Sequence, residues 1–165
     1  MPFMPGVRTC VRSVVVAGSA VAFAAAMALG AAGPAGPARA SATGSTAVGT
    51  FDYDVRGVGV RVPVGCFLTH TIDGSGRRIT GQSAGVDCAG LAATFSRFCN
   101  WRIDFAYADT DNRTYRTSRG ATHAECRGNP LRRAVPQRLP KFGKACAKFH
   151  VNGKLRAVQC HYITR

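Results

Sequence analysis

The sequence predicts an all-β domain with one short helix, in which a small antiparallel sheet or sandwich of hairpins is stapled by three disulfides. Three observations indicate this fold class. Short strand-like runs recur between turn signals rich in Gly, Asn and Asp. Asn152-Gly153 separates two such runs near the C-terminus. Six cysteines remain once the first 40 residues are set aside, as in small stapled domains.

The N-terminal 40 residues have the features of a secretory signal peptide. Arg8 and Arg12 precede an apolar run over 13–29, and Ala38-Arg39-Ala40 is a small-residue cleavage site. The run approaches membrane-spanning length, so an N-terminal anchor is the alternative. Cleavage leaves a secreted, extracellular chain of 125 residues without a membrane span. Its predicted parts are a disordered Ser/Thr/Gly/Ala-rich segment at 41–50 and a single domain at 51–165.

The cysteines predict the covalent framework. Of the seven, Cys10 lies in the leader. The other six, an even number in an exported chain, predict three disulfides with fifteen possible pairings. There is no Cys-x-x-Cys pair and no Cys/His cluster at zinc spacing, so we expect no metal site and no cofactor. The bridging residues are Cys66, Cys88, Cys99, Cys126, Cys146 and Cys160.

The chain is strongly basic. Of 22 Lys and Arg residues three lie in the leader, which leaves 19 against eight acidic residues and a net charge of about +11. Such a charge favours acidic partners: nucleic acid, anionic lipid, wall polymer or an acidic protein cleft. The charge alone does not choose among them.

Asn152-Gly153 predicts a C-terminal hairpin, because both central residues of a type I′ turn need φ > 0. With these residues as the turn, Val151 faces Lys154 and Ala147 faces Val158. Alternation then places Cys146 and Cys160 on opposite faces, so they are not expected to bond to each other. The predicted core face carries Ala145, Ala147, Phe149, Val151, Val158, Cys160 and Tyr162, and the wetter face carries Cys146, Lys148, His150, Gln159 and His161.

Alternating valines mark the first strand-like run of the domain, Phe51 to Gly65. Val58, Val60, Val62 and Val64 share one face, and Gly and Pro at alternate positions suit an edge strand. One interpretation is an edge strand that closes the domain's own core. The other is a partly free strand that pairs with the sheet edge of another protein.

Two more hairpins and a helix are predicted in the middle of the chain. Cys66 to Cys88 reverses at Asp73-Gly74-Ser75-Gly76, and we expect His70 to be half-exposed in its first strand. Leu91, Phe95 and Phe98 at helical spacing predict a short amphipathic helix between Cys88 and Cys99, with Asp87 as a possible N-cap and the aromatic residues in the core. The third hairpin begins with the alternating run Trp101 to Tyr107 and places Tyr107 opposite Arg116 and Asp104 opposite Arg119.

The segment from Cys126 to Cys146 is predicted to be a long cationic loop. It has no acidic residue, and three prolines argue against a helix or strand running through it. Long loops in compact domains tend to be functional, and the flanking cysteines lower the entropy lost when this one is ordered on a partner. A solvated loop whose charges serve solubility is the alternative. The candidate binding residues are Arg127, Arg132, Arg133, Arg138, Lys141 and Lys144 in the loop, together with Val58, Val60 and Val62 in the strand.

Recognisable catalytic motifs are absent from the sequence. It has no Gly-x-Ser-x-Gly and no His-Glu-x-x-His, and the cysteines are assigned to bridges. An acid/base group built from His70, His123, Glu125 and an arginine is the one enzymatic alternative, as in a ribonuclease. We therefore expect a non-enzymatic protein.

The layout of leader, Val/Gly strand, three bridges and basic Pro-rich loop resembles the small adaptor subunit of the secreted umbrella toxin particles of high-GC Gram-positive bacteria. The resemblance implies an adaptor that joins other secreted subunits through a strand and a positively charged loop that enters an acidic cleft. The matching positions are Val58 to Val64 for the strand and Arg132, Arg133, Arg138 and Lys141 for the loop. The leading hypothesis is thus an adaptor that binds an acidic protein. A cationic antibacterial protein or ribonuclease is second, and an inhibitor of an extracellular hydrolase is third.

Overall fold

The computed structural model describes residues 40–165; the predicted leader, apart from Ala40, lies outside the described residues. Eleven strands and one short helix make up the described part of the chain, and every strand pairing is antiparallel. The elements are β1 (Ala40–Ala47), β2 (Phe51–Val55), β3 (Val58–Val62), β4 (Cys66–Ser75), β5 (Arg78–Cys88), α1 (Leu91–Phe95), β6 (Trp101–Ala108), β7 (Thr114–Ser118), β8 (Leu131–Ala134), β9 (Gln137–Arg138), β10 (Gly143–Val151) and β11 (Lys154–Ile163). The predicted β-dominated fold class is confirmed.

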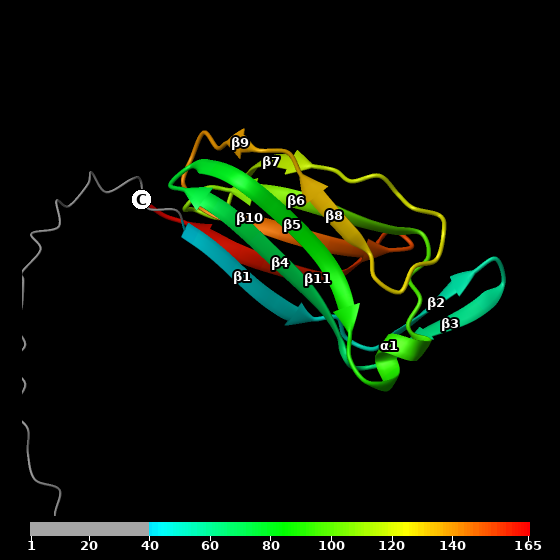
Figure 1. Ribbon diagram of the computed structural model, residues 1–165. Helices are drawn as coiled ribbons and strands as arrows, with labels where there is room; N and C mark the ends of the chain where they lie inside the picture. The colour runs from blue at the N-terminus through cyan, green and yellow to red at the C-terminus, as the bar shows by residue number, and fades with distance from the viewer. Residues whose placement is uncertain (1–39) are drawn as a thin grey trace, which may run out of the picture. The chain divides into compact units, whose positions relative to one another are not determined.

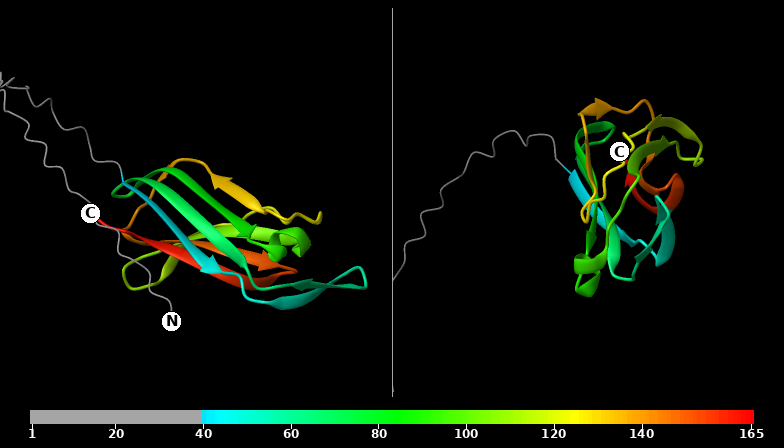
Figure 2. Two further views of the ribbon diagram at one scale, coloured as in Figure 1. Left: turned by 60° about the horizontal axis from the view of Figure 1, so that its bottom comes forward. Right: turned by 90° about the vertical axis from the view of Figure 1, so that its right-hand side faces the viewer.

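Two sheets pack face to face as a sandwich. One has the order β1-β4-β5-β8, with β9 continuing the edge along β5, and the other has the order β11-β10-β6-β7. Figures 1 and 2 show these two layers, with the β2–β3 hairpin at one end. Alternate residues of each central strand face the core, as a pleated strand requires. The core includes Leu68, Val86, Phe105 and Phe149, all fully buried.

The C-terminal hairpin forms at the predicted turn, but its register changes inside it. Asn152 and Gly153 have φ values of 50° and 74°. Val151 pairs with Lys154 as predicted, whereas a bulge between Phe149 and His150 in the register leaves Arg156 without a partner, so that Phe149 faces Ala157. A one-residue slip moves every later side chain of β11 to the other face of the sheet.

The bulge overturns the predictions made for β11. Cys146 faces Cys160 and bonds to it, so the prediction that these two cysteines bond elsewhere is wrong. Tyr162, predicted in the core, is exposed. Gln159 and His161, predicted on the wetter face, contact Thr46 and His70 of the opposite sheet.

The prediction of a disordered segment at 41–50 is also wrong. β1 pairs with β4 over its whole length, from Ala40 opposite Gly74 to Ala47 opposite Phe67. Hydroxyl pairs link the two strands, with 3.0 Å between the hydroxyls of Thr43 and Thr71. Polar residues lie on both faces of this edge strand, so it lacks the apolar alternation that marks a half-buried strand.

The three predicted disulfides are present. Cys66–Cys88 links β4 to β5, and Cys146–Cys160 links β10 to β11. Cys99–Cys126 instead ties the start of β6 to the segment that precedes β8. Three bridges in a small domain are typical of an oxidising, extracellular environment.

The helix is shorter than predicted and buries less. α1 has five residues, follows Gly90 rather than Asp87, and buries Ala92. Phe98 lies beyond it and is fully buried, whereas Leu91 and Phe95 are 79% and 67% exposed. The prediction that Phe95 belongs to the core is therefore wrong. Within residues 40–165, no helix has the length and apolar character needed to cross a membrane.

Candidate interaction surfaces

The predicted cationic loop is in large part the edge of the five-stranded sheet. β8 pairs with β5 from Gln82 to Gly85, and β9 pairs with β5 at Arg78 and Ile79. The prediction that no strand runs through this segment is wrong, because Pro136 falls in the gap between β8 and β9, where no ladder bond is required. The basic side chains of β8 and β9 therefore project from a backbone that is fixed by pairing with β5.

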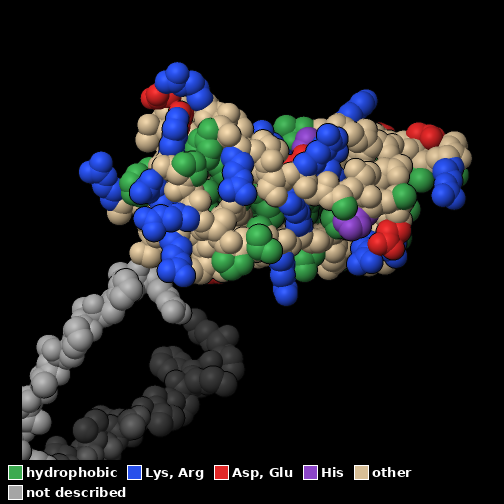
Figure 3. Space-filling view, turned by 90° about the horizontal axis from the view of Figure 1, so that it is seen from above, with side chains coloured by type: hydrophobic (Ala, Val, Ile, Leu, Met, Phe, Trp, Pro, Cys, Tyr) green, Lys and Arg blue, Asp and Glu red, His purple; other side chains and the backbone are tan. Residues whose placement is uncertain are grey.

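Three exposed arginines define what we call the cationic edge. Arg133 pairs with Ser83 and points away from the core, while Arg78 and Arg138 are opposite each other across β5 and β9. None of the three forms an ion pair with another described residue. Figure 3 shows Lys and Arg side chains spread over the face that carries β7, β8 and β9, with few acidic side chains among them.

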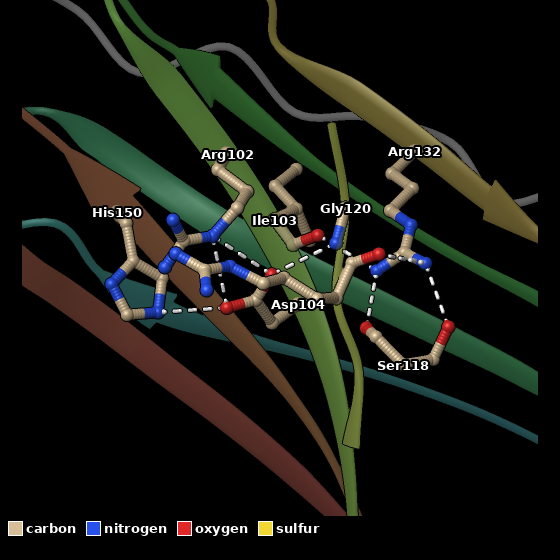
Figure 4. Close-up of polar contacts among 8 residues, drawn as sticks. Arg102, Ile103, Asp104, Ser118, Gly120, Arg132 and His150 are labelled. Carbon is tan, nitrogen blue, oxygen red and sulfur yellow. Dashed lines mark hydrogen bonds and ion pairs between the residues drawn. The ribbon is translucent and has the colours of Figure 1, made fainter. Parts of the chain in front are cut away.

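Arg132, a predicted binding residue, points inward instead. Its guanidinium donates to the carbonyl oxygens of Ile103 and Ser118 at 2.8 and 2.7 Å and to the Ser118 hydroxyl at 2.8 Å (Figure 4). It also lies 4.8 Å from the centre of the Phe105 ring. Burial lowers the pKa of Arg132 from its ordinary value. Arg132 therefore joins the two sheets and is not available to a partner.

The other predicted loop cations lie at the surface, each with a neighbour. Arg127 forms an ion pair with Glu125 at 2.9 Å. Lys141 lies 3.4 Å from a carboxylate oxygen of Asp109, and Lys144 lies 5.1 Å from the centre of the Tyr162 ring. Exposed pairs of this kind contribute little to stability, so these cations can exchange partners.

A buried chain of polar side chains lies beneath the cationic edge. Gln137 of β9 donates to the Tyr107 hydroxyl, which donates to Gln82 Oε1 at 2.6 Å. The Gln82 amide nitrogen lies 3.0 Å from His70 Nε2 and donates to it, which requires that nitrogen to be unprotonated. His70 is fully buried, so the prediction of a half-exposed histidine is wrong. Burial, together with the smaller effect of the nearby His161, lowers the pKa of His70 to about 4.

The lowered pKa of His70 predicts a loss of stability in mild acid. The unfolded chain takes up a proton on this histidine near its ordinary pKa of about 6.5, whereas the folded protein does so only near pH 4. Between about pH 7.5 and pH 5 the free energy of unfolding should therefore fall by roughly 2 kcal/mol through His70 alone. Urea unfolding at the two pH values should show the fall, and His70→Gln should remove that part of it. Equal falls in wild type and variant would contradict the assignment.

The β2–β3 hairpin is a separate two-stranded sheet that turns at Arg56 and Gly57. Its base is fixed, because Tyr53 is buried and donates its hydroxyl to the Arg97 carbonyl at 2.6 Å. The β2 side is also held, because Asn152 donates to the carbonyl of Asp54 at 2.6 Å. The outer edge of β3 pairs with no other described strand.

The predicted valine contacts differ along β3. Val58 is 64% exposed and Val60 is half-buried, but Val62 is fully buried and belongs to the core. Further exposed apolar area comes from Val64, Leu91 and Phe95. α1 lies close to the end of this hairpin: a Cβ added to Gly65, which follows β3, would be 3.3 Å from the Cβ of Ala92. Because the helical spacing of Leu91 and Phe95 predicted a core face, this exposed apolar surface was not predicted.

The residues of the enzymatic alternative do not form one accessible site. His70 is buried between the sheets. His123 stacks on Trp101 with 4.1 Å between ring centres, and Glu125 is exposed beside Arg127.

The fold and these surfaces define a disulfide-stapled β-sandwich with a cationic sheet edge. No family model, curated protein or solved structure gave a match to the chain.

Proposed function

We propose that this is a secreted, non-enzymatic adaptor that binds an acidic protein surface through the cationic edge, with the open edge of β3 as a second contact. The observation that carries the proposal is that Arg78, Arg133 and Arg138 project from paired strands and have no acidic partner among residues 40–165. An acidic partner would supply the missing counter-charges.

The order of the edge favours a specific protein contact. Leu139 is buried and donates its backbone N–H to the backbone carbonyl of Arg77 at 2.8 Å. The Arg77 side chain donates in turn to the Pro140 carbonyl at 2.7 Å. With the anchors at Arg132 and Gln137, the backbone of the edge is set before any partner binds. Binding then loses little conformational entropy, which raises affinity for a partner of matching shape.

Open strand edges attract further strands. Within residues 40–165 the outer edge of β3 has no strand partner, and the exposed Val58 lies on this strand, an arrangement that suits addition of a strand from another protein. Two separate contacts are what an adaptor between two subunits needs.

Replacement of two edge arginines tests the proposal. Tagged protein incubated with its own culture supernatant at physiological salt should retain one or more defined secreted proteins. Arg133→Ala/Arg138→Ala should weaken that retention about tenfold or more, since it removes two unpaired charges from the contact. Lys154→Ala/Arg165→Ala, which removes the same charge from other exposed positions, should bind as wild type does.

The salt dependence decides between this function and its alternative. A shape-matched protein contact should persist at physiological salt, whereas nonspecific binding of nucleic acid or wall polymer should fall steeply as salt rises. Retention of RNA or wall material alone, equally reduced in both double variants, would contradict the adaptor and favour a cationic antibacterial protein.

A further inference from the structure

A small pocket opens beside the β10–β11 turn, at the end of the four-stranded sheet. Its volume is about 290 Å³, and none of its lining residues is acidic. The lining groups are amides, a hydroxyl, an imidazole and a guanidinium. The residues that line it are Asn100, Arg102, Thr122, His150, Asn152 and Gly153.

Arg102 is held in a fixed orientation within this pocket. Its Nε donates to both carboxylate oxygens of Asp104 at 3.0 Å (Figure 4). Asp104 also accepts the backbone N–H of Gly120 at 2.9 Å, which fixes the carboxylate in turn. The Arg102 side chain is only 12% exposed, yet its two terminal nitrogens form no hydrogen bond with another described residue. The planar end of the guanidinium is therefore preorganised and unoccupied by protein groups.

His150 lies next to Arg102 and, like it, is close to Asp104. The two residues are opposite each other on β10 and β6. His150 Nε2 is 3.4 Å from an oxygen of Asp104, but neither ring nitrogen forms a hydrogen bond within the described chain, although both are buried. Buried polar atoms without a hydrogen bond are uncommon in folded proteins, and a polar group bound in the pocket would supply the hydrogen bond that His150 lacks within the described chain.

We propose that this pocket binds the carboxylate group of a small organic acid, with the terminal nitrogens of Arg102 as the principal contact and Thr122 and His150 beside it. A guanidinium presents two parallel N–H groups that match the two oxygens of a carboxylate. The volume is at the lower end for ligand pockets, which suits a small acid. This site is independent of the proposed adaptor function.

The local charge favours a single negative charge on the ligand. Asp104 offsets Arg102, and Lys148, opposite Asp104 on β10, adds one positive charge. A carboxylate is balanced by this one net charge, whereas sulfate or phosphate would bring a second negative charge out of water without a counter-charge, which costs desolvation free energy.

Titration of the protein with acetate and with N-acetylglycine, at constant ionic strength and monitored by NMR, tests the proposal. Both probes should give saturable shifts of the Arg102, Thr122 and His150 signals in the millimolar range, and sulfate should not. Arg102→Lys retains the charge but loses the planar fork, and it should weaken binding about tenfold. Lys154→Ala, on the adjacent turn, should bind as wild type does.

Several outcomes would overturn the proposal: shifts that do not saturate, equal affinity in Arg102→Lys and wild type, or sulfate binding at least as tight as acetate. If Arg102→Lys does not fold, Thr122→Val is the deciding variant, because Thr122 is exposed and takes no part in the hydrogen bonds that hold Arg102 and Asp104. Loss of the Thr122 hydroxyl should weaken the binding of both probes about threefold. Unchanged affinity would show that Thr122 does not contact the ligand and would contradict the proposed site.

Discussion

Reduction of the three disulfides is expected to unfold the protein. If each bridge acts by restricting the unfolded chain, closures of 14, 22 and 27 residues contribute about 3, 3.4 and 3.6 kcal/mol. Their combined contribution, about 10 kcal/mol, is comparable to the whole stability of a typical domain, about 5–15 kcal/mol. Circular dichroism and urea unfolding, with and without reductant at neutral pH, measure the effect.

The individual bridges should differ in a predictable order. Cys146–Cys160 links strands that their own backbone ladder also joins, whereas Cys99–Cys126 holds the segment that runs beside Trp101 and Asp104. Replacing the Cys99–Cys126 pair with alanines should therefore lower the unfolding free energy more than replacing the Cys146–Cys160 pair. A reduced protein that still unfolds cooperatively at the wild-type urea midpoint would contradict the whole expectation.

The parts of the fold that the sequence predicts are those set by local chemistry. The Asn152-Gly153 turn needs two residues with positive φ, and few other sequences satisfy that requirement. The strand from Trp101 and the pairing of Tyr107 with Arg116 follow from alternation and a short turn. In each of these the deciding residues are close together in the chain.

The sequence-based predictions fail where the local structure depends on a single unpaired residue or on a strand distant in the chain. One unpaired residue, Arg156, reverses the face of everything that follows it in β11, and no local signal marks it. β1 becomes a strand because β4 offers it a partner, not because of its own apolar pattern. Such tertiary causes are not visible in the composition of the segment itself.

The candidate site shows the same division between local and distant causes. Sequence reasoning placed Arg132 and Arg133 together as equivalent loop cations. Once the segment is a strand, adjacent side chains point to opposite faces, so Arg132 enters the sandwich and Arg133 faces solvent. Only the pairing of β8 with β5, 46 or more residues earlier in the chain, reveals which of the two can meet a partner.

Asp104→Ala is expected to destabilise the protein by about 3–5 kcal/mol, because it removes one member of a buried ion pair and leaves Arg102 buried without a counter-charge. The sequence placed Asp104 opposite Arg119. In the structure the β6–β7 ladder ends with Phe105 opposite Ser118, and the Asp104 carboxylate accepts from Arg102 of its own strand and from the Gly120 N–H. The loss therefore affects both the face of the sheet and the crossing segment. Urea unfolding at neutral pH gives the free energy directly.

An exposed ion pair supplies the matched control. Arg113 and Asp111 are 2.6 Å apart, closer than Arg102 and Asp104, but both are largely exposed. Asp111→Ala should cost no more than about 1 kcal/mol, because water solvates the remaining arginine. Asp104→Asn, which keeps an acceptor for Gly120 while losing the charge, should fall between the two. If Asp104→Ala and Asp111→Ala lower the unfolding free energy equally, burial does not determine the strength of the Asp104 contact. Water would then solvate the Arg102 guanidinium even without its counter-charge.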